Sequence, residues 1–419
     1  MKLILFITLF YSSLFCCYGQ WEIIDTSANS SYNDLEIISE SKVLFFGDVE
    51  GKSGVIHYNP INELLDTVII SNSGQITHSF LINDTTLLAL HNLSDVYISK
   101  DSGFTFNLIG GFPLIGGSTF DFHFINDTIG FFTWCDNGNG SYKSVDGGET
   151  WSQIYDSTLF FNSVNLGGCG VDNLNSSVYK VSGTVFLQST NYGVNWIEQS
   201  TNTVNRSYKN IDVNEFDGSL FLCGIGFQGS PNFNYGTIAK SVDYGNTWTI
   251  IDIPEARWLN DIEMASATVG YTVGPFINSG SGVIYKTIDS GNSWFSQNFS
   301  NFSNFYVSPK CIKCRGEDTC YVVGSYGLIA KTNNGGVGID EFASIKHSSI
   351  YPNPAKGHIS VSFSKEFLNV NYTIHSLQGH LVGTGSLNGD IIIENLRNGA
   401  YILTISNGEF IETHKFIKM

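Results

Sequence analysis

Three arginines offer the chain its main potential for binding an acidic substrate, because a guanidinium group donates two parallel hydrogen bonds to one carboxylate. They are Arg206, Arg257 and Arg315, and a fourth arginine, Arg397, lies near the C-terminus. Arg206 and Arg257 precede segments expected to be strands, whereas Arg315 lies in an expected hairpin turn at the opposite strand end. We therefore expect that these three side chains do not converge on one carboxylate.

The cysteine and histidine side chains do not indicate a metal or catalytic site. Cys311-x2-Cys314 has half the spacing of a zinc site, but no further Cys or His pair completes it, so a disulfide or a buried thiol is favoured. The histidines show no metal-ligand spacing, and no Gly-x-Ser-x-Gly segment marks a serine nucleophile. We expect no metal, no cofactor and no catalytic residue.

The strands that position these residues can be predicted from a repeated turn of the form [Ser/Thr]-x-Asp-x-Gly-x-[Thr/Ser]-Trp. It occurs as SKDSGFTF (99–106), SVDGGETW (144–151), STNYGVNW (189–196), SVDYGNTW (241–248), TIDSGNSW (287–294) and TNNGGVGI (332–339). Its Asp or Asn positions lie 45, 45, 52, 46 and 45 residues apart. This period is typical of propeller blades with four short strands each. With an early unit, GVIHYNP (54–60), the sequence predicts an all-β protein with a seven-bladed β-propeller, six blades being the alternative.

The repeated turn is expected to build blades and not to catalyse. Its Asp can accept hydrogen bonds from backbone N–H groups of its own turn, and its Gly can supply a positive φ. The aromatic residue that follows can pack between neighbouring sheets. The residues assigned to this structural role are Asp101, Asp146, Asn191, Asp243, Asp289, Trp151, Trp196, Trp248 and Trp294. Asp121, Asp212 and Asp261 recur at the start of inner strands, and either a structural role or a place in a central channel is open for them.

The start and end of the propeller are predicted to meet in one blade. The last unit lacks an outer strand, and Trp21-Glu22-Ile23-Ile24 near the N-terminus resembles the missing strand. Pairing these segments would remove an exposed sheet edge.

A disulfide is predicted from two blades that align without a gap, NDIEMASATVGYTVG (260–274) and KCIKCRGEDTCYVVG (310–324). Cys314 aligns with Met264 at the end of an inner strand, and Cys320 aligns with Gly270 at the start of the next strand. A hairpin with five residues between these cysteines brings them within disulfide range.

The repeats over residues 20–338 resemble the Asp-box, or BNR, repeats of sialidases, sortilin-like propellers and photosystem II assembly factor-like propellers. The resemblance implies the fold, and such folds carry unrelated activities. A sialidase would need three converging arginines, and its Phe-Arg-Ile-Pro type segment is absent. Non-catalytic binding of a protein or glycan is therefore favoured, with a glycoside hydrolase of sialidase-like or other Asp-box type as the alternative.

The two ends of the chain predict export. Residues 1–19 have the basic start and short apolar run of a signal peptide, and no other apolar run is long enough to span a membrane after cleavage. After a linker at 339–347, residues 348–419 predict a small Ig-like β-sandwich. This module resembles the C-terminal sorting domain of type IX secretion substrates, which implies handling by that machinery and secretion or attachment to the outer-membrane surface. The matching residues are Tyr351, Pro352, Asn353, Pro354, Gly399, Tyr401, Lys415 and Lys418.

A candidate ligand-binding face is predicted opposite the Asp turns. The chain has a net charge of −17, which argues against binding nucleic acid or anionic lipid. Long insertions at 224–236 and 274–282, with the links at 198–210 and 255–261, depart from the repeat and should open on that face. Their aromatic and cationic residues are Arg206, Arg257, Trp258, Phe227, Phe233, Tyr235 and Phe276, which are types enriched in binding sites.

Overall fold

The computed structural model is all-β and describes most of the chain. The described residues are 21–25, 27, 29–92, 94–111, 120–134, 140–156, 168–172, 177–183, 185–191, 195, 197–201, 205–228, 233–276, 282–297, 307–336, 348–363, 370–376, 381–387, 389–406 and 411–419. The expected signal peptide, the linker and Trp196 lie outside them. Within these ranges, no helix has the length and apolar character needed to cross a bilayer.

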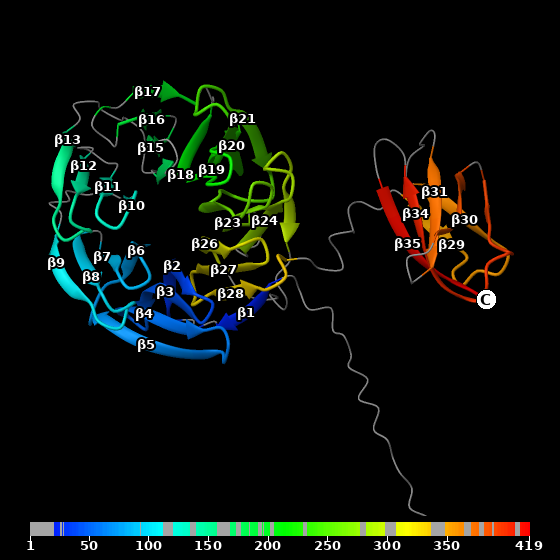
Figure 1. Ribbon diagram of the computed structural model, residues 1–419, viewed down its shortest axis with the longest axis horizontal. Coiled ribbons are helices and arrows are strands. Elements are labelled where there is room, and N and C mark those ends of the chain that lie inside the picture. Colours follow the sequence, from blue (N-terminus) through cyan, green and yellow to red (C-terminus); the bar gives the residue numbers. More distant parts are fainter. Residues whose placement is uncertain are drawn as a thin grey trace, which may run out of the picture. The chain divides into compact units, whose positions relative to one another are not determined.

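The chain divides into two compact units, Met1–Gly336 and Val337–Met419. In the described part of the first unit, seven four-stranded antiparallel sheets follow one another around a ring (Figure 1). The β-propeller expected from the repeats is confirmed, and we refer to the sheets as blades 1 to 7 in the order of their inner strands.

The blades have the following strands. Blade 1 consists of β2 (Ser31–Ser39), β3 (Lys42–Val49), β4 (Lys52–Asn59) and β5 (Leu64–Ser71). Blade 2 consists of β6 (Ile76–Leu81), β7 (Leu87–His91), β8 (Asp95–Ser99) and β9 (Asn107–Gly111). Blade 3 consists of β10 (Phe120–Phe124), β11 (Gly130–Trp134), β12 (Gly140–Ser144) and β13 (Ser152–Asp156). Blade 4 consists of β14 (Gly168–Asp172), β15 (Ser177–Ser182), β16 (Val185–Ser189) and β17 (Ile197–Ser200).

The last three blades carry most of the residues of the candidate site. Blade 5 consists of β18 (Arg206–Val213), β19 (Leu220–Gln228), β20 (Phe233–Ser241) and β21 (Thr249–Ile253). Blade 6 consists of β22 (Asp261–Met264), β23 (Gly270–Pro275), β24 (Gly282–Thr287) and β25 (Phe295–Gln297). Blade 7 consists of β26 (Pro309–Arg315), β27 (Thr319–Gly324), β28 (Ile329–Thr332) and the N-terminal strand β1 (Glu22–Asp25).

Ring closure by the N-terminal strand is confirmed. Strand β1 pairs antiparallel with β28, and Glu22 lies opposite Lys331. Trp21, just before β1, is fully buried in the core shared by blades 6 and 7, where its ring meets Tyr271 edge-on at 6.0 Å between centroids. The buried Lys331 ammonium also donates to Tyr58 Oη at 3.1 Å and pairs with Glu63 of blade 1. Closure therefore joins three consecutive blades.

The strand order gives the ring two chemically different faces. Each inner strand begins on the face that we call the link face, which carries the connections between blades and the β19–β20 and β23–β24 loops. The repeated Asp- or Asn-containing turns, for which we keep the label Asp-box turns, connect the third and fourth strands of a blade and lie on the opposite face, the turn face. This arrangement follows from antiparallel neighbours within each blade.

The Asp-box turns have a repeated hydrogen-bond pattern. In blade 5, Ser241 donates its hydroxyl to Asp243 at 2.8 Å, and the Thr247 backbone N–H and hydroxyl donate to the same carboxylate at 2.8 and 2.6 Å. These donors hold the pKa of Asp243 below its usual value. Tyr244 and Gly245 both have positive φ, 59° and 86°. The described turns thus use the Asp as a structural acceptor.

The turns also fasten each blade to the preceding one. A Cβ on Gly245 would lie 2.3 Å from Cε1 of Phe186 in blade 4, and a Cβ on Gly291 would lie 2.4 Å from the equivalent atom of Phe221 in blade 5. Glycine is required at these positions both for positive φ and for close approach.

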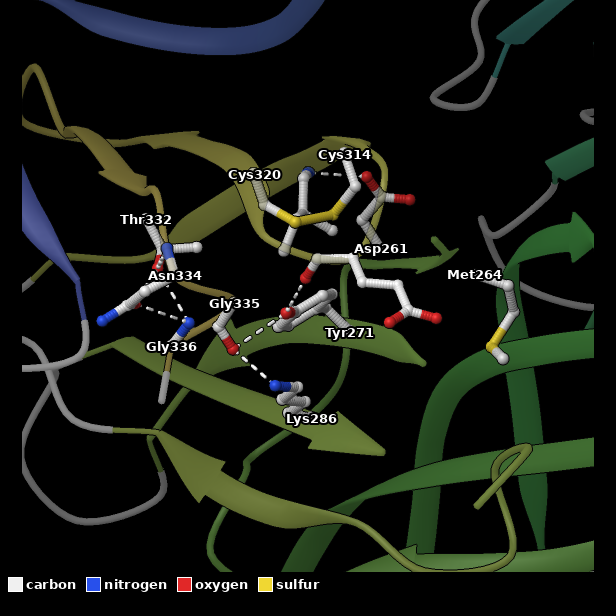
Figure 2. The surroundings of a disulfide bond; sticks show 12 residues. Asp261, Met264, Tyr271, Lys286, Cys314, Cys320, Thr332, Asn334, Gly335 and Gly336 are labelled. Carbon is white, nitrogen blue, oxygen red and sulfur yellow. Dashed lines mark hydrogen bonds between the residues drawn. A yellow bond between two sulfur atoms is a disulfide. The ribbon is translucent and has the colours of Figure 1, made fainter. Parts of the chain in front are cut away.

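The structure contains a disulfide between Cys314 and Cys320, the pair expected from the blade alignment (Figure 2). These residues lie opposite each other in the β26–β27 hairpin. Figure 2 also shows Tyr271 and Lys286 of blade 6 donating to the Gly335 carbonyl, at 2.9 and 2.6 Å. The hairpin end of blade 7 and its last turn are thus held near blade 6.

The second unit is a small sandwich of two antiparallel sheets. One sheet contains β29 (Ser348–Tyr351), β30 (His358–Phe363) and β33 (Ile391–Ile392). The other contains β31 (Asn371–Ser376), β32 (Leu381–Ser386), β34 (Gly399–Ser406) and β35 (Ile411–Lys418).

The sorting-motif residues of this unit lie close to one another. Asn353 donates its side-chain amide to the Lys415 carbonyl at 2.9 Å and accepts the Ile417 N–H at 3.1 Å. Tyr401 is buried, stacks on Phe416 of β35, and donates to the carbonyl of Arg397. The two ends of the motif therefore meet at the last strand.

Candidate functional site

The link face carries two arginine–aromatic pairs on neighbouring blades. Arg206, at the start of β18, has its guanidinium carbon 5.9 Å from the ring centroid of Tyr235. Arg257, in the link to blade 6, lies 5.1 Å from the centroid of Trp258. Such contacts place a cation over an aromatic face. One pair joins residues from different strands of blade 5, and the other joins two consecutive residues of the link to blade 6.

The two arginines differ in their remaining contacts. Arg206 forms an ion pair with Asp252 of β21 at 2.6 Å, and only 20% of its side chain is exposed. Arg257 is exposed, and among the described residues no carboxylate pairs with it. Arg257 is therefore the better candidate to meet an incoming acidic group.

The aromatic residues of the predicted face also differ in exposure. Phe227, at the end of β19, is 44% exposed, whereas Tyr235 and Trp258 are half-buried. Phe276 is half-buried and packs against the core between blades 5 and 6. Phe233 starts β20, but its side chain lies outside the described residues.

The third arginine of the propeller lies on the other face. Arg315 ends β26 beside the β26–β27 hairpin, and its guanidinium is 3.3 Å from Glu40. Because the three arginines occupy two faces and two of them have acidic partners, they do not form a common carboxylate clamp.

A further set of polar residues faces the axis of the ring, where the inner strands meet. The register of four inner strands shifts by one residue near the link face, which leaves an extra bulged residue in each. The bulged residues are Asn33, Thr77, Lys209 and Lys310. The repeat spacing does not reveal these bulges, because a bulge changes pairing and not the number of residues per blade.

Hydrogen bonds join the bulge level from blade 5 to blade 2. Lys209 Nζ donates to Asn260 Oδ1 at 3.0 Å, and Asn260 donates to the Pro309 carbonyl at 2.6 Å. Lys310 Nζ then donates to Asn33 Oδ1 at 2.6 Å, and Asn33 donates to the carbonyl at the start of β6. We call these four side chains, Lys209, Asn260, Lys310 and Asn33, the axial belt.

Below the axial belt, carboxylates link the inner strands of successive blades. Asp212 accepts the Met264 N–H at 2.8 Å, and Asp261 accepts the Ile312 N–H at 2.8 Å. Asp34 accepts the Ser79 N–H at 2.6 Å. Asp212 and Asp261 are therefore structural links between blades, and they also face the axis. The side chain of Asp121 lies outside the described residues.

Burial perturbs the ionisation of these axial groups. It raises the pKa of Asp212 to about 7 and that of Asp261 to about 6. It lowers the pKa of His78 to about 4 and that of His123 to about 3, so both imidazoles are neutral at neutral pH. Such shifts occur in structural networks as well as in functional sites.

Solvent still reaches the axis. Along β22 the axis-facing residues Asp261 and Glu263 are half-buried, while the alternate residues Ile262 and Met264 are buried. Lys313 of β26 keeps 32% of its side chain exposed although it pairs with Glu36 at 3.1 Å. Among the described residues, no three His, Cys, Asp or Glu side chains are grouped to hold a metal ion.

Sequence reasoning placed Trp258 and the arginines but missed the axial belt. The alignment of residues 260–274 with 310–324 already puts Asn260 and Lys310 at one position, so the polar character of that position was the available signal. Only the structure shows that the predicted binding face and the axial belt are connected: Trp258 Nε1 and Lys209 Nζ both donate to Asn260 Oδ1, each at 3.0 Å.

Comparisons with known proteins assign the C-terminal unit and the fold of the first. Residues 349–419 match the family of secretion system C-terminal sorting domains. No curated protein sequence shows significant similarity to the chain.

Solved structures with a similar fold include YCF48 bound to D1 peptide, with TM-score 0.56, 13% identity, and coverage of 75% of this chain and 97% of that one. YCF48 from Cyanidioschyzon merolae gives TM-score 0.55, 12% identity and coverages of 75% and 98%. The extracellular domain of the putative hybrid two-component system BT3049 from B. thetaiotaomicron gives 0.53, 10% identity and coverages of 96% and 57%.

At these identities the likeness concerns the fold alone. The sorting domain indicates export, followed by secretion or attachment to the cell surface. The chain is thus a β-propeller that carries at its C-terminus a type IX secretion sorting domain.

Proposed function

We propose that this exported propeller binds a protein or glycan partner without catalysis, through its link face at blades 5 and 6. The observation that carries the proposal is the position of Trp258: a half-buried indole beside the exposed Arg257 and directly bonded to the axial belt. Aromatic and arginine side chains in such settings are the usual anchors of interfaces.

The contrast between the two faces supports this location. The Asp-box carboxylates on the turn face are occupied by donors of their own turns, so they serve the fold. The link face combines exposed Arg257 and Phe227 with loops that depart from the repeat. A similar propeller that binds a peptide, YCF48 with D1 peptide, provides an example of the fold in a binding role.

A hydrolase of sialidase type is the second candidate, and the arginine arrangement argues against it. Arg206 is paired with Asp252, and Arg315 with Glu40 on the turn face. A site that clamps one sugar carboxylate with three guanidinium groups would need different positions.

The mature protein is proposed to begin at Gln20 after signal-peptide cleavage and to lose the sorting domain at the cell surface. Mass spectrometry of the protein recovered from its native cells tests both ends. A species that retains residues 1–19 would contradict the cleavage, and one that retains residues 348–419 would contradict removal of the sorting domain.

A binding screen on protein and glycan arrays, run with the chain from residue 20 to 419, tests the proposed function. Trp258→Ala and Tyr235→Ala should abolish binding of any partner found while changing the melting temperature little. Phe216→Ala is the matched control, because Phe216 is 61% exposed near the β18–β19 hairpin on the turn face. Turnover of glycosides in a parallel assay, or equal loss of binding in the control, would contradict the proposal.

A further inference from the structure

We propose that Lys209 and Lys310 form a carboxylate-binding subsite at the link-face end of the axis, with Trp258 as its aromatic wall. This inference rests on the proposed function and adds the chemical class of the ligand. It concerns residues of the axial belt, which the repeat pattern does not single out.

The two lysines are held by neutral oxygen atoms only. Lys310 Nζ donates to Asn33 Oδ1 at 2.6 Å and to Ser31 Oγ at 2.9 Å, and Lys209 Nζ donates to Asn260 Oδ1 at 3.0 Å. Among the described residues neither ammonium forms an ion pair with a carboxylate. By contrast, Lys313, deeper along the axis, pairs with Glu36 at 3.1 Å. The Asp261 carboxylate attracts the Lys209 charge without a hydrogen bond and opposes the lowering of its pKa. Neither ammonium group is bonded to a carboxylate of the described residues, so both remain able to donate to an anionic ligand.

The cost of burying the two ammonium charges favours binding of an anionic ligand. Burial, and to a lesser extent the nearby charge of Lys209, lower the pKa of Lys310 to about 8. Burial also lowers the pKa of Lys209. Holding a partly buried charge without a counter-ion costs stability. An anion that accepts a hydrogen bond from both ammonium groups would offset this cost.

The surrounding charges favour a monoanion. The carboxylates of Asp34 and Asp261 lie farther along the inner strands. They would repel a dianion such as phosphate more strongly than a single carboxylate, since Coulomb repulsion grows with charge. We assign one ammonium group to each oxygen of the carboxylate.

Trp258 adds a constraint on the group that carries the carboxylate. Because Trp258 Nε1 and Lys209 Nζ both lie 3.0 Å from Asn260 Oδ1, they are no more than about 6 Å apart. A carboxylate at Lys209 would place its attached apolar or ring-shaped group against the indole. Exposed Arg257 lies over the same ring and would meet the next polar group of the ligand.

Isothermal titration calorimetry of the 20–419 chain with paired small probes tests the subsite. One pair is N-acetyl-alanyl-phenylalanine with a free carboxyl end and the same dipeptide as its amide; the other is galacturonate and galactose. The variants are Lys209→Gln and Lys310→Gln, and Lys52→Gln is the control, because Lys52 is exposed on β4. The pair whose acid binds identifies the source of the carboxylate.

We expect one acid to bind at least about tenfold more tightly than its neutral partner, and each axial variant to weaken that acid by about tenfold or more, as for loss of a charge-assisted hydrogen bond. Lys52→Gln should bind as wild type does. Equal binding of acid and neutral probes, unchanged binding in both axial variants, or no binding of either acid would overturn the proposal.

A measurement on the wild-type chain covers the case in which a glutamine variant does not fold. Because the subsite needs a protonated Lys310, affinity for the acid should fall as the pH rises through about 8. Acid binding that is constant across this range contradicts the assignment. A macromolecular partner that binds both axial variants normally would refute the subsite and leave the proposed function intact, whereas the absence of any partner would refute the proposed function.

Discussion

Replacing Trp21 with alanine should destabilise the propeller strongly, because this side chain closes the ring. Trp21 is fully buried and packs edge-on against Tyr271, and the strand that follows it pairs with β28. A frayed terminus would tolerate the change with almost no effect.

The expected magnitude follows from burial. Removing a fully buried tryptophan side chain from a core costs about 3–5 kcal/mol. For domains of 150–250 residues each kcal/mol lowers the melting temperature by about 2–4 °C, and the larger propeller unit should follow the lower end. We therefore expect Trp21→Ala to lower the melting temperature by about 6–10 °C, and deletion of residues 20–25 to lower it at least as much.

Differential scanning calorimetry of the 20–419 chain provides the measurement, because it separates the transition of the propeller from that of the sorting domain. Phe295→Ala is the matched control: Phe295 is an aromatic residue in an outer strand, β25, but is 50% exposed. We expect the control to change the free energy of unfolding by less than about 0.5 kcal/mol. A Trp21→Ala transition within about 1 °C of wild type would refute closure by the N-terminal strand.

Three further changes test the account of the blades. Asp212→Asn should stabilise the chain at pH 8 by about 1–2 kcal/mol, because the native pKa of about 7 lies above the ordinary 3.8 and ionisation of Asp212 costs stability as the pH rises between these values. Urea unfolding at pH 4 and pH 8 measures this effect, and an equal change in the free energy of unfolding at both pH values would contradict it. Gly245→Ala should cost more than about 1 kcal/mol, because φ is positive and the new methyl group meets Phe186; a thermal unfolding curve identical to wild type would refute this reading. The Cys314→Ser/Cys320→Ser double variant should unfold at a lower temperature by calorimetry, since the disulfide restricts the unfolded chain, and free thiols in peptides mapped from the oxidised wild type would contradict the bond itself.

Local sequence signals predicted the parts of the fold that depend on contacts between residues close together in the sequence. The Asp, its hydroxyl neighbours and the following Gly are encoded within eight residues, so the hydrogen bonds around Asp243 could be inferred before any tertiary contact was known. The N-terminal segment that begins at Trp21 could be assigned to the last blade because the last repeat lacks an outer strand. The cysteine pair lies within a single hairpin, which fixes its register.

The candidate site was less accessible, because it depends on pairing across blades. The ion pair of Arg206 with Asp252 joins the first and last strands of blade 5, and no local pattern predicts it. The bulges that place Lys209 and Lys310 near the axis depend on strand register, which a single sequence specifies poorly. Asn260 acquires its role only when it accepts hydrogen bonds from both Trp258 and Lys209.

The central claim, that ligands dock on the link face at blades 5 and 6, is tested most directly by hydrogen–deuterium exchange of the chain with and without a partner from the binding screen. We predict slower exchange in residues 205–210, 255–260 and 307–311, where the links meet the axial belt. Exchange in the Asp-box turns at 243–248 and 289–294 should not change. Protection confined to those turns, with none in the link-face segments, would contradict the claim.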